Sequence, residues 1–144
     1  MNLQECIKFA SENPLCSLAT VDGGQPHVRT VMLMYAEESG FYFETFPNKE
    51  MSKQMHENPN VEICFFNNAE DMMESKQLRI KGKVEFTDDP ETVDRVYEVI
   101  KVLEPLAGGP FKHLMEVFKV AHGDAHFWTM MDVGKEAALE HLKF

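Results

Sequence analysis

The first third of the chain consists of runs of β-forming residues joined by very short turns, and this feature constrains the fold most. Leu15–Val21 and Pro26–Tyr35 are separated by Asp22-Gly23-Gly24, and Phe41–Phe46 follows the turn Glu38-Ser39-Gly40. Turns of this length join antiparallel neighbours, because parallel strands need a crossover of about a dozen residues or more. The sequence therefore favours an antiparallel sheet over a parallel βαβ arrangement.

Helices and further strands are expected around this beginning. Apolar residues at helical spacing predict a helix over Leu3–Glu12, and a second helix is expected over Lys49–Asn58 with Asn48 as its N-cap. Two more strands are expected at Asn60–Asn67 and Gln77–Thr87.

The last third of the chain is expected to contain a helix, a loop and a hairpin. The helix begins at Asp88-Asp89-Pro90, and Leu103–Lys112 is expected to be a loop because it holds two prolines and two glycines. The closing elements are a hairpin of Met115–Ala121 and Ala125–Met131, which turns at His122-Gly123-Asp124, and a short final helix.

The second strand indicates how the sheet is arranged. Both of its faces are largely apolar between Val28 and Tyr35, which suits a barrel strand that is covered inside by the core and outside by a helix or a second subunit. No linker, repeat or low-complexity tract divides the 144 residues. We predict one domain, residues 1–144, that is a mainly β antiparallel barrel with peripheral helices.

Charge and composition argue against several classes of partner. The formal net charge of −10 disfavours nucleic acid, because non-specific binding to it depends on many basic side chains. No apolar run approaches the roughly 20 residues of a membrane-spanning helix, and Met1–Cys6 does not have the features of a signal peptide. Three widely spaced cysteines are typical of reduced thiols. We therefore expect a cytoplasmic protein with no nucleic-acid or membrane partner.

Several side chains in the N-terminal half are candidates for an anion site. Arg29 stands in an apolar strand, where it either binds an anion or instead pairs with a carboxylate or reaches water. Lys49 and Lys53 share a helix face, where their repulsion and the helix dipole are unfavourable unless a phosphate binds there. A solvated helix face is the ordinary alternative. Together with the Thr45 hydroxyl, these residues favour an anion site.

The second half of the chain offers weaker candidates. Alternation along Gln77–Phe86 places Gln77, Arg79, Lys81 and Lys83 on one polar face, which is the outward face of a half-exposed strand. Trp128, the only tryptophan, is by default a core aromatic and otherwise a wall for a planar ligand.

Two histidines raise the question of a metal site. His122 and His126 straddle the expected turn and have no cysteine or carboxylate partner at zinc spacing. One turn histidine and one strand histidine is the favoured interpretation, and no metal is expected. Glycine-rich phosphate loops and nucleophile motifs are absent from the sequence.

Four segments, taken in order and spacing, resemble the FMN-binding split barrels related to pyridoxamine 5′-phosphate oxidase. They are Cys16–Leu33, Gly40–Phe66, Gln77–Phe86 and Ala125–Met131, and the resemblance runs along nearly the whole chain. It implies an antiparallel split β-barrel that works as a homodimer, with FMN at the subunit interface and residues of both chains in each site.

The resemblance also implies which residues bind the cofactor. Arg29 would contact FMN, Thr45 would hydrogen-bond to it, and Lys49 with Lys53 would hold its phosphate. Gln77 and Trp128 would approach the flavin, from the same chain or from the partner. The full expected set is Arg29, Thr30, Val31, Met32, Thr45, Lys49, Ser52, Lys53, Gln77 and Trp128, with the backbone of Val31 and Met32 along the flavin edge.

The expected function is that of an FMN-dependent oxidoreductase, which transfers a hydride or electrons to a small substrate that the sequence does not identify. The chain ends in a short amphipathic segment where the oxidases use an arginine-rich segment, which weighs against oxidation of a vitamin B6 phosphate. The alternatives are a flavin-binding or electron-relay protein without turnover, and a split barrel that uses a deazaflavin or haem instead of FMN.

Overall fold

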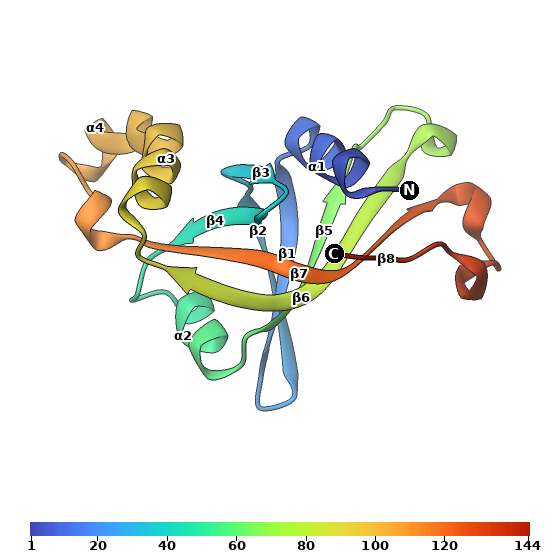
Figure 1. Ribbon diagram of the computed structural model, residues 1–144, viewed down its shortest axis with the longest axis horizontal. Helices are drawn as coiled ribbons and strands as arrows, with labels where there is room; N and C mark the ends of the chain where they lie inside the picture. The colour runs from blue at the N-terminus through green and yellow to red at the C-terminus, as the bar shows by residue number, and fades with distance from the viewer.

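The computed structural model describes residues 1–144 and consists of one curled antiparallel sheet with helices around it (Figure 1). The eight strands are β1 (Leu15–Asp22), β2 (Gln25–Met32), β3 (Tyr35–Glu37), β4 (Gly40–Thr45), β5 (Asn60–Phe66), β6 (Lys76–Thr87), β7 (Glu116–Thr129) and β8 (Leu142–Lys143). The α-helices are α1 (Leu3–Glu12), α2 (Glu50–Glu57), α3 (Pro90–Ile100) and α4 (Glu104–Ala107).

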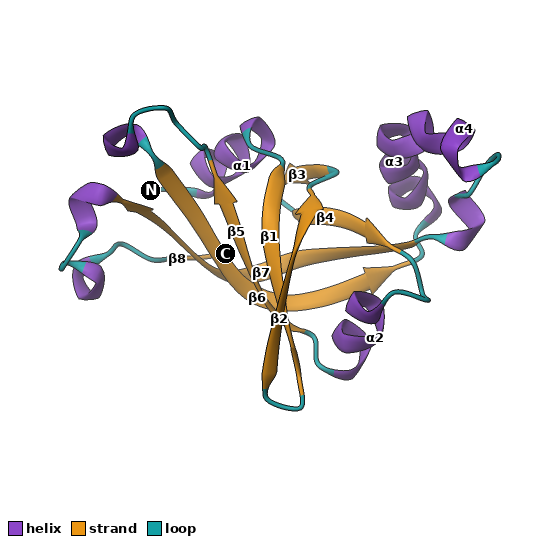
Figure 2. Cartoon of the chain, turned by 180° about the vertical axis from the view of Figure 1, so that it is seen from behind, coloured by secondary structure: helices purple, strands orange, loops and turns teal.

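The strands are ordered β2-β1-β5-β6-β7-β4-β3, and β8 pairs with β7. The two strands at the ends of this path, β2 and β3, are joined by only two residues, so the sheet has to curl round on itself. Leu33 donates its N–H to the carbonyl of Pro14 at 2.8 Å, and Met34 donates to the carbonyl of Tyr42 at 2.9 Å. The expected antiparallel split barrel with peripheral helices is confirmed (Figure 2).

Alternate residues of the strands fill the barrel. Leu18, Ile63 and Ile80 are fully buried, and the rings of Phe43 and Phe118 stack with centroids 5.4 Å apart. Burial of an aliphatic or aromatic side chain of this size stabilises a fold by about 1.5–3 kcal/mol. A smaller apolar cluster lies between α3 and the sheet, and its buried members are Met34, Val96, Tyr97, Ile100, Phe111 and Val117.

The first and third helices begin as the sequence predicts. Asn2 caps α1, and its side chain accepts the N–H of Glu5 while the Glu5 carboxylate accepts the N–H of Asn2. Asp89 caps α3, with Pro90 at the first helical position. Leu103–Lys112 is not wholly a loop, because it contains the single turn of α4. None of the helices combines the length and apolar character that a membrane crossing requires.

The start of α2 differs from the expectation. The helix begins at Glu50, and its N-cap is Lys49 rather than Asn48. Lys49 has extended backbone angles and its side chain makes no capping hydrogen bond. A lysine side chain has no acceptor with which to cap, so no side chain caps the first N–H groups of α2.

The second strand is shorter than expected, and its outward face is exposed. Pro26–Tyr35 is divided into β2 and the start of β3 by Leu33 and Met34, where the chain crosses between the two edges of the sheet. On the outward face of β2, Val28 is 70% exposed. In the isolated chain, therefore, no helix covers the outer apolar face of this strand.

The predicted closing hairpin is wrong, because Met115–Met131 contains the single long strand β7, which pairs with β6 along most of its length. The chain passes through His122-Gly123-Asp124 without reversing. The reason lies in two glycines, Gly82 and Gly123, at which β6 and β7 approach closely. A Cβ on Gly82 would lie 2.6 Å from the His122 carbonyl oxygen, and one on Gly123 would lie 2.5 Å from that of Lys81.

The predicted final helix is also wrong. A 3₁₀ turn at Glu136–Ala138 is followed by β8, which places Lys143 opposite Asp124 on β7. The ring of Phe144 packs against Phe41, with centroids 5.7 Å apart. An extended end packs this partly buried ring against the barrel core, and apolar contact therefore overrides the local helical pattern.

Candidate functional site

Arg29 reaches from β2 toward the middle of α2 and joins a network of neutral partners. Its Nη1 donates to the Thr20 hydroxyl at 2.7 Å, and its Nη2 donates to Gln54 Oε1 at 2.9 Å. The Thr20 hydroxyl in turn donates to Gln54 Oε1 at 2.6 Å. Nη1 also donates to the carbonyl oxygen of His27 at 3.3 Å. The structure thus joins Arg29 to α2 through Gln54, a contact that the sequence did not predict.

No carboxylate neutralises this guanidinium. Arg29 is half-buried, and burial lowers its pKa from the ordinary value. A guanidinium has five N–H donors, and the network leaves the Nε–H and one Nη2–H of Arg29 free. Pairing with a carboxylate, one of the two ordinary alternatives for this residue, is not what the structure shows.

The two lysines at α2 differ in their partners. Lys53 forms an ion pair with Glu50, with Nζ and Oε1 3.0 Å apart. Lys49 forms no ion pair, and its Nζ lies 5.3 Å from the centroid of the Phe46 ring. Lys49 therefore stands, without an ion-pair partner, at a helix start that no side chain caps.

Thr45, at the end of β4, is fully buried, and its Oγ1 has no hydrogen-bond partner. The neighbouring Glu44 also has a buried oxygen, Oε2, without a partner. Burial raises the pKa of the Glu44 carboxyl, and the charge of Lys49 opposes the rise. Glu44 has no signal in the sequence, because a single glutamate in a strand is usually assigned to the solvent face.

Ser52 is buried on α2, and its hydroxyl donates to Glu116 Oε1 on β7 at 2.9 Å. The other oxygen of Glu116 lies 2.7 Å from His56 Nε2, and the His56 ring stacks on Phe86 at 3.8 Å between centroids. The proton of Ser52 is thus directed at β7, and these contacts fix the position of α2 against the barrel.

The remaining expected residues lie around the outward face of the sheet. Thr30 and Met32 are exposed on β2, whereas Val31 alternates to the inner side. Thr30 helps to line a hollow of about 490 Å³ together with Cys64 of β5. Cys64 Sγ lies 3.7 Å from Gln77 Oε1, so this part of the outward face continues from β2 to β6.

Gln77 and Trp128 lie opposite each other on β6 and β7. Trp128 is half-buried and lies outside both core clusters, so its default interpretation as a core aromatic is wrong. Gln77 and Trp128 line a hollow of about 360 Å³, whose other lining residues are Arg79, His126, Glu136, Leu139 and His141. Within one chain, the structure therefore separates the expected residues into three groups, which lie at α2, on β2 beside the hollow that Thr30 lines, and at this hollow.

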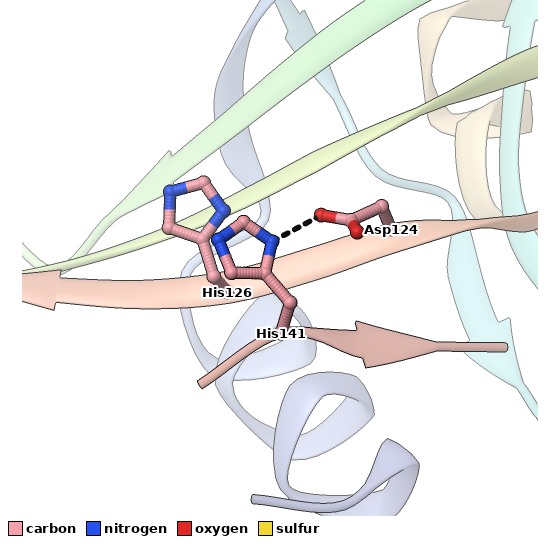
Figure 3. Close-up of side chains that lie close together, drawn as sticks. All are labelled: Asp124, His126 and His141. Carbon is pink, nitrogen blue, oxygen red and sulfur yellow. Dashed lines mark hydrogen bonds and ion pairs between the residues drawn. The ribbon is translucent and has the colours of Figure 1, made fainter. Parts of the chain in front are cut away.

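A cluster of side chains that the sequence analysis missed borders the second hollow (Figure 3). His141, just before β8, has its Nδ1 2.6 Å from Asp124 Oδ1, and its ring stacks on that of His126 with centroids 4.6 Å apart. Lys143 Nζ lies 2.6 Å from the other Asp124 oxygen. These contacts hold the pKa of Asp124 at about 2, and burial lowers the pKa of His126.

One signal could have revealed part of this cluster. Asp124 and His126 are two apart, so they share one face of any continuous strand. The turn placed at His122-Gly123-Asp124 hid this pair. The participation of His141 depends on the pairing of β8 with β7, which the sequence pattern does not indicate.

The comparison with known sequences identifies one family. The family model described as pyridoxamine 5′-phosphate oxidase matches residues 3–128. A pyridoxine/pyridoxamine 5′-phosphate oxidase of Ehrlichia ruminantium is 39% identical over 97 residues, which are 65% of this chain and 47% of that protein. The chain thus spans less than half the length of this relative.

Solved structures share the fold at low sequence identity. A NimC/NimA family protein of Clostridium acetobutylicum has a TM-score of 0.78 at 22% identity and covers 100% of this chain and 94% of its own. An FAD-binding protein of Mesorhizobium loti has a TM-score of 0.68 at 21% identity, and the match covers 84% of this chain and 89% of that protein. HutZ, a haem storage protein of Vibrio cholerae, has a TM-score of 0.66 at 17% identity, and the match covers 88% of this chain and 93% of that protein. The match to residues 3–128, supported by the split-barrel fold, shows that the chain belongs to the pyridoxamine 5′-phosphate oxidase family.

Proposed function

We propose that this protein binds FMN and acts as an oxidoreductase on a small substrate. The observation that carries the proposal is the half-buried Arg29, which has free N–H donors and no carboxylate, next to the helix whose start no side chain caps. Membership of the pyridoxamine 5′-phosphate oxidase family supports a flavin as the ligand. The likeness to an FAD-binding protein supports it further.

The phosphate of FMN fits the α2 region on chemical grounds. Free backbone N–H groups at a helix start and the positive end of the helix dipole favour an anion. Lys49 adds a charge without an ion-pair partner, and Arg29 adds a planar donor group suited to phosphate. Lys53 would exchange its exposed pair with Glu50 for the phosphate at little cost, because such pairs contribute about 0–1 kcal/mol.

The Thr45 hydroxyl also fits a bound polar group. A buried hydroxyl without a partner costs about 1–3 kcal/mol, so an orphan atom of this kind marks a position where a ligand or water is expected. We assign the hydrogen bond of Thr45 to the cofactor. Ser52, whose proton is directed at Glu116, retains acceptor capacity for the same ligand.

A homodimer would complete the site. The outward faces of β1, β2 and β5 carry exposed apolar side chains, namely Leu15, Val28, Met32 and Phe66, with exposures of 64%, 70%, 39% and 42%. An apolar patch of this kind is typical of an interface. We propose that a second copy covers it, so that Gln77 and Trp128 of one chain approach the flavin held by the other.

The flavin would supply hydride or electron transfer, and the chain would supply binding, orientation and the electrostatic surroundings. Arg29 and Lys49 would hold the cofactor, while Thr30 and the backbone of Val31 and Met32 would lie along the ring edge. We also propose that the 144 residues work as one domain in the cytoplasm. The chain spans less than half of the relative named as a vitamin B6 phosphate oxidase, and the proposal leaves the identity of the small substrate open.

The first experiment is the absorption spectrum of the purified protein, before and after incubation with FMN and gel filtration. We expect flavin bands to be retained, and we expect Lys49→Ala with Lys53→Ala to weaken FMN binding about tenfold or more. The matched control is Lys81→Ala with Lys83→Ala, which removes two exposed charges from the outward face of β6. Equal affinities in the two double variants would refute the phosphate assignment.

Two outcomes would point to the alternative functions. Retention of haem but not of FMN would favour a haem protein, an alternative supported by the likeness to HutZ. Bound flavin without turnover of NAD(P)H and a quinone or nitro compound would favour a storage or relay protein.

A further inference from the structure

We infer that Asp124, His126 and His141 form a site for a divalent transition metal ion such as Zn²⁺. The ion would fasten the C-terminal segment to the sheet. This site is separate from the α2 region and does not depend on whether the protein binds flavin.

The three residues converge on one point. One ligand atom from each lies within 4.8 Å of the others, a spacing that small movements would reduce to the distance between neighbouring ligands of one ion. Asp124 and His126 come from one face of β7, and His141 directly precedes β8, the strand that pairs beside them (Figure 3). Strand pairing thus holds the backbone of the ligands on both sides.

Each functional group has an atom available for the ion. Lys143 occupies Oδ2 of Asp124, and Oδ1 faces His141 Nδ1 at 2.6 Å. In the metal-free protein a proton lies between these two atoms, and a metal ion would take its place. A neutral His141 imidazole would then carry its proton on Nε2, whereas an imidazolium would release one proton to solvent. No bond between heavy atoms breaks, and no oxidation state changes.

His126 distinguishes this arrangement from an ordinary aspartate–histidine pair. Asp124 and His141 alone would satisfy each other, but His126 packs against the pair and its Nδ1 is buried with no hydrogen-bond partner. A buried imidazole nitrogen without a partner is unusual, because buried polar atoms are nearly always hydrogen-bonded. A metal ion shared with the two neighbours would give the imidazole of His126 a partner.

The nearby cations do not fill the site. Arg79, opposite His126 on β6, is directed to Glu62 in an ion pair. Lys81 is opposite Asp124 but is exposed, and Lys143 is 80% exposed. Glu136, which lines the adjoining hollow, adds a further negative charge near the site.

The ligand set favours a zinc-like ion over magnesium or calcium. Imidazole suits Zn²⁺, Ni²⁺, Cu²⁺ and Co²⁺, whereas Mg²⁺ and Ca²⁺ prefer oxygen ligands. Three protein ligands leave a coordination position for water, and the hollow of about 360 Å³ beside His126 and His141 has room for it. An ion bound only by the folded chain would also stabilise the docking of β8.

The test is metal titration of tag-free, chelator-treated protein. We expect one Co²⁺ per chain with visible absorption bands of nitrogen and oxygen coordination, and we expect Zn²⁺ to displace it and to raise the melting temperature. His126→Ala, His141→Ala and Asp124→Asn should each weaken Zn²⁺ binding about tenfold or more. His122→Ala is the matched control, because His122 is an exposed histidine of the same strand outside the cluster.

Circular dichroism would establish that each variant is folded, and Asp124→Asn, which keeps the side-chain shape, would carry the test if an alanine variant failed to fold. The inference is overturned if the wild type shows no saturable Co²⁺ binding, or if the three variants bind Zn²⁺ as tightly as His122→Ala. Zn²⁺ binding in a protein that takes up no FMN would support this site while refuting the proposed function.

Discussion

Thr20 and Thr45 are both fully buried inside the barrel, yet their hydroxyls differ in what they contact. Thr20 accepts from Arg29 and donates to Gln54, whereas Thr45 Oγ1 has no partner. The first hydroxyl is part of a satisfied network, so its removal leaves polar partners unpaired. The second is unfavourable in the free protein and gains a partner only if a ligand is bound.

Thr45→Val is therefore expected to have opposite effects on stability and on cofactor binding. The nearly isosteric valine removes an unsatisfied hydroxyl, so the free energy of unfolding of the flavin-free protein should rise by about 1 kcal/mol. FMN affinity should fall, because the hydrogen bond assigned to Thr45 is lost. Urea unfolding without flavin and a flavin titration measure the two quantities.

Thr20→Val is the matched control, because it removes the hydroxyl that hydrogen-bonds to both Arg29 and Gln54. It should destabilise the flavin-free protein by about 1–3 kcal/mol. If the Thr45→Val protein binds FMN as well as the wild type, Thr45 does not hydrogen-bond to the cofactor.

Single residues could be predicted where the local pattern carries the signal. Arg29 stood out as a charge in an apolar strand, and the alternation along β6 placed Lys81 and Lys83 outward, as the structure confirms. Gln54 and Glu116 could not be predicted in this way. Their contacts join residues 25 to 64 positions apart, and only the folded barrel brings them together.

At the scale of elements, β6 and β7 show why the sequence misleads at one place. His122-Gly123-Asp124 has the composition of a turn, but a glycine in a strand also permits close approach of a neighbouring backbone. The pairing register of β6 and β7 shifts between Gly82 and Val84, so the pairing of the two long strands is irregular at that point. The same three residues can form a turn or a strand segment that lies close to a neighbouring backbone. Only the position of β6 in the folded protein decides between the two.

Gly82→Ala is expected to destabilise the protein strongly. The added methyl group would meet the His122 carbonyl oxygen at 2.6 Å and Val120 Cγ1 at 2.7 Å. The backbone oxygen cannot move without breaking the pairing of β6 and β7, so we expect a loss of about 1–3 kcal/mol. Thermal or urea unfolding measures it. The neighbouring Lys83→Ala, which alters an exposed side chain, should change stability by less than about 0.5 kcal/mol.

A Gly82→Ala protein as stable as Lys83→Ala would mean that the strands separate easily at this point. The close approach of β6 and β7 at the two glycines would then not explain why β7 is continuous.

At the scale of the whole molecule, the sequence predicted the class of fold but not the order of its strands. Short turns indicated antiparallel neighbours, and the two apolar faces of the second strand indicated a barrel. The order β2-β1-β5-β6-β7-β4-β3 depends on pairings between distant segments, which periodicity does not report. The outer apolar face of β2 remains exposed in the single chain, which supports the second subunit proposed as its cover.

Leu15→Glu is expected to weaken the proposed dimer. Leu15 is 64% exposed in the single chain and pairs with Met32 on the apolar outward face, so a buried carboxylate there would be costly. Light scattering after gel filtration should show a shift from dimer to monomer. FMN affinity should fall at the same time, because each proposed site draws Gln77 and Trp128 from the partner.

Leu106→Glu is the matched control, because Leu106 on α4 is 87% exposed and lies on a different part of the molecule (Figure 1). It should remain dimeric and bind FMN as the wild type does. A Leu15→Glu monomer with wild-type FMN affinity would show that one chain suffices for binding, and the shared site would be wrong even though the interface was right. A Leu15→Glu dimer would place the interface on another face of the barrel.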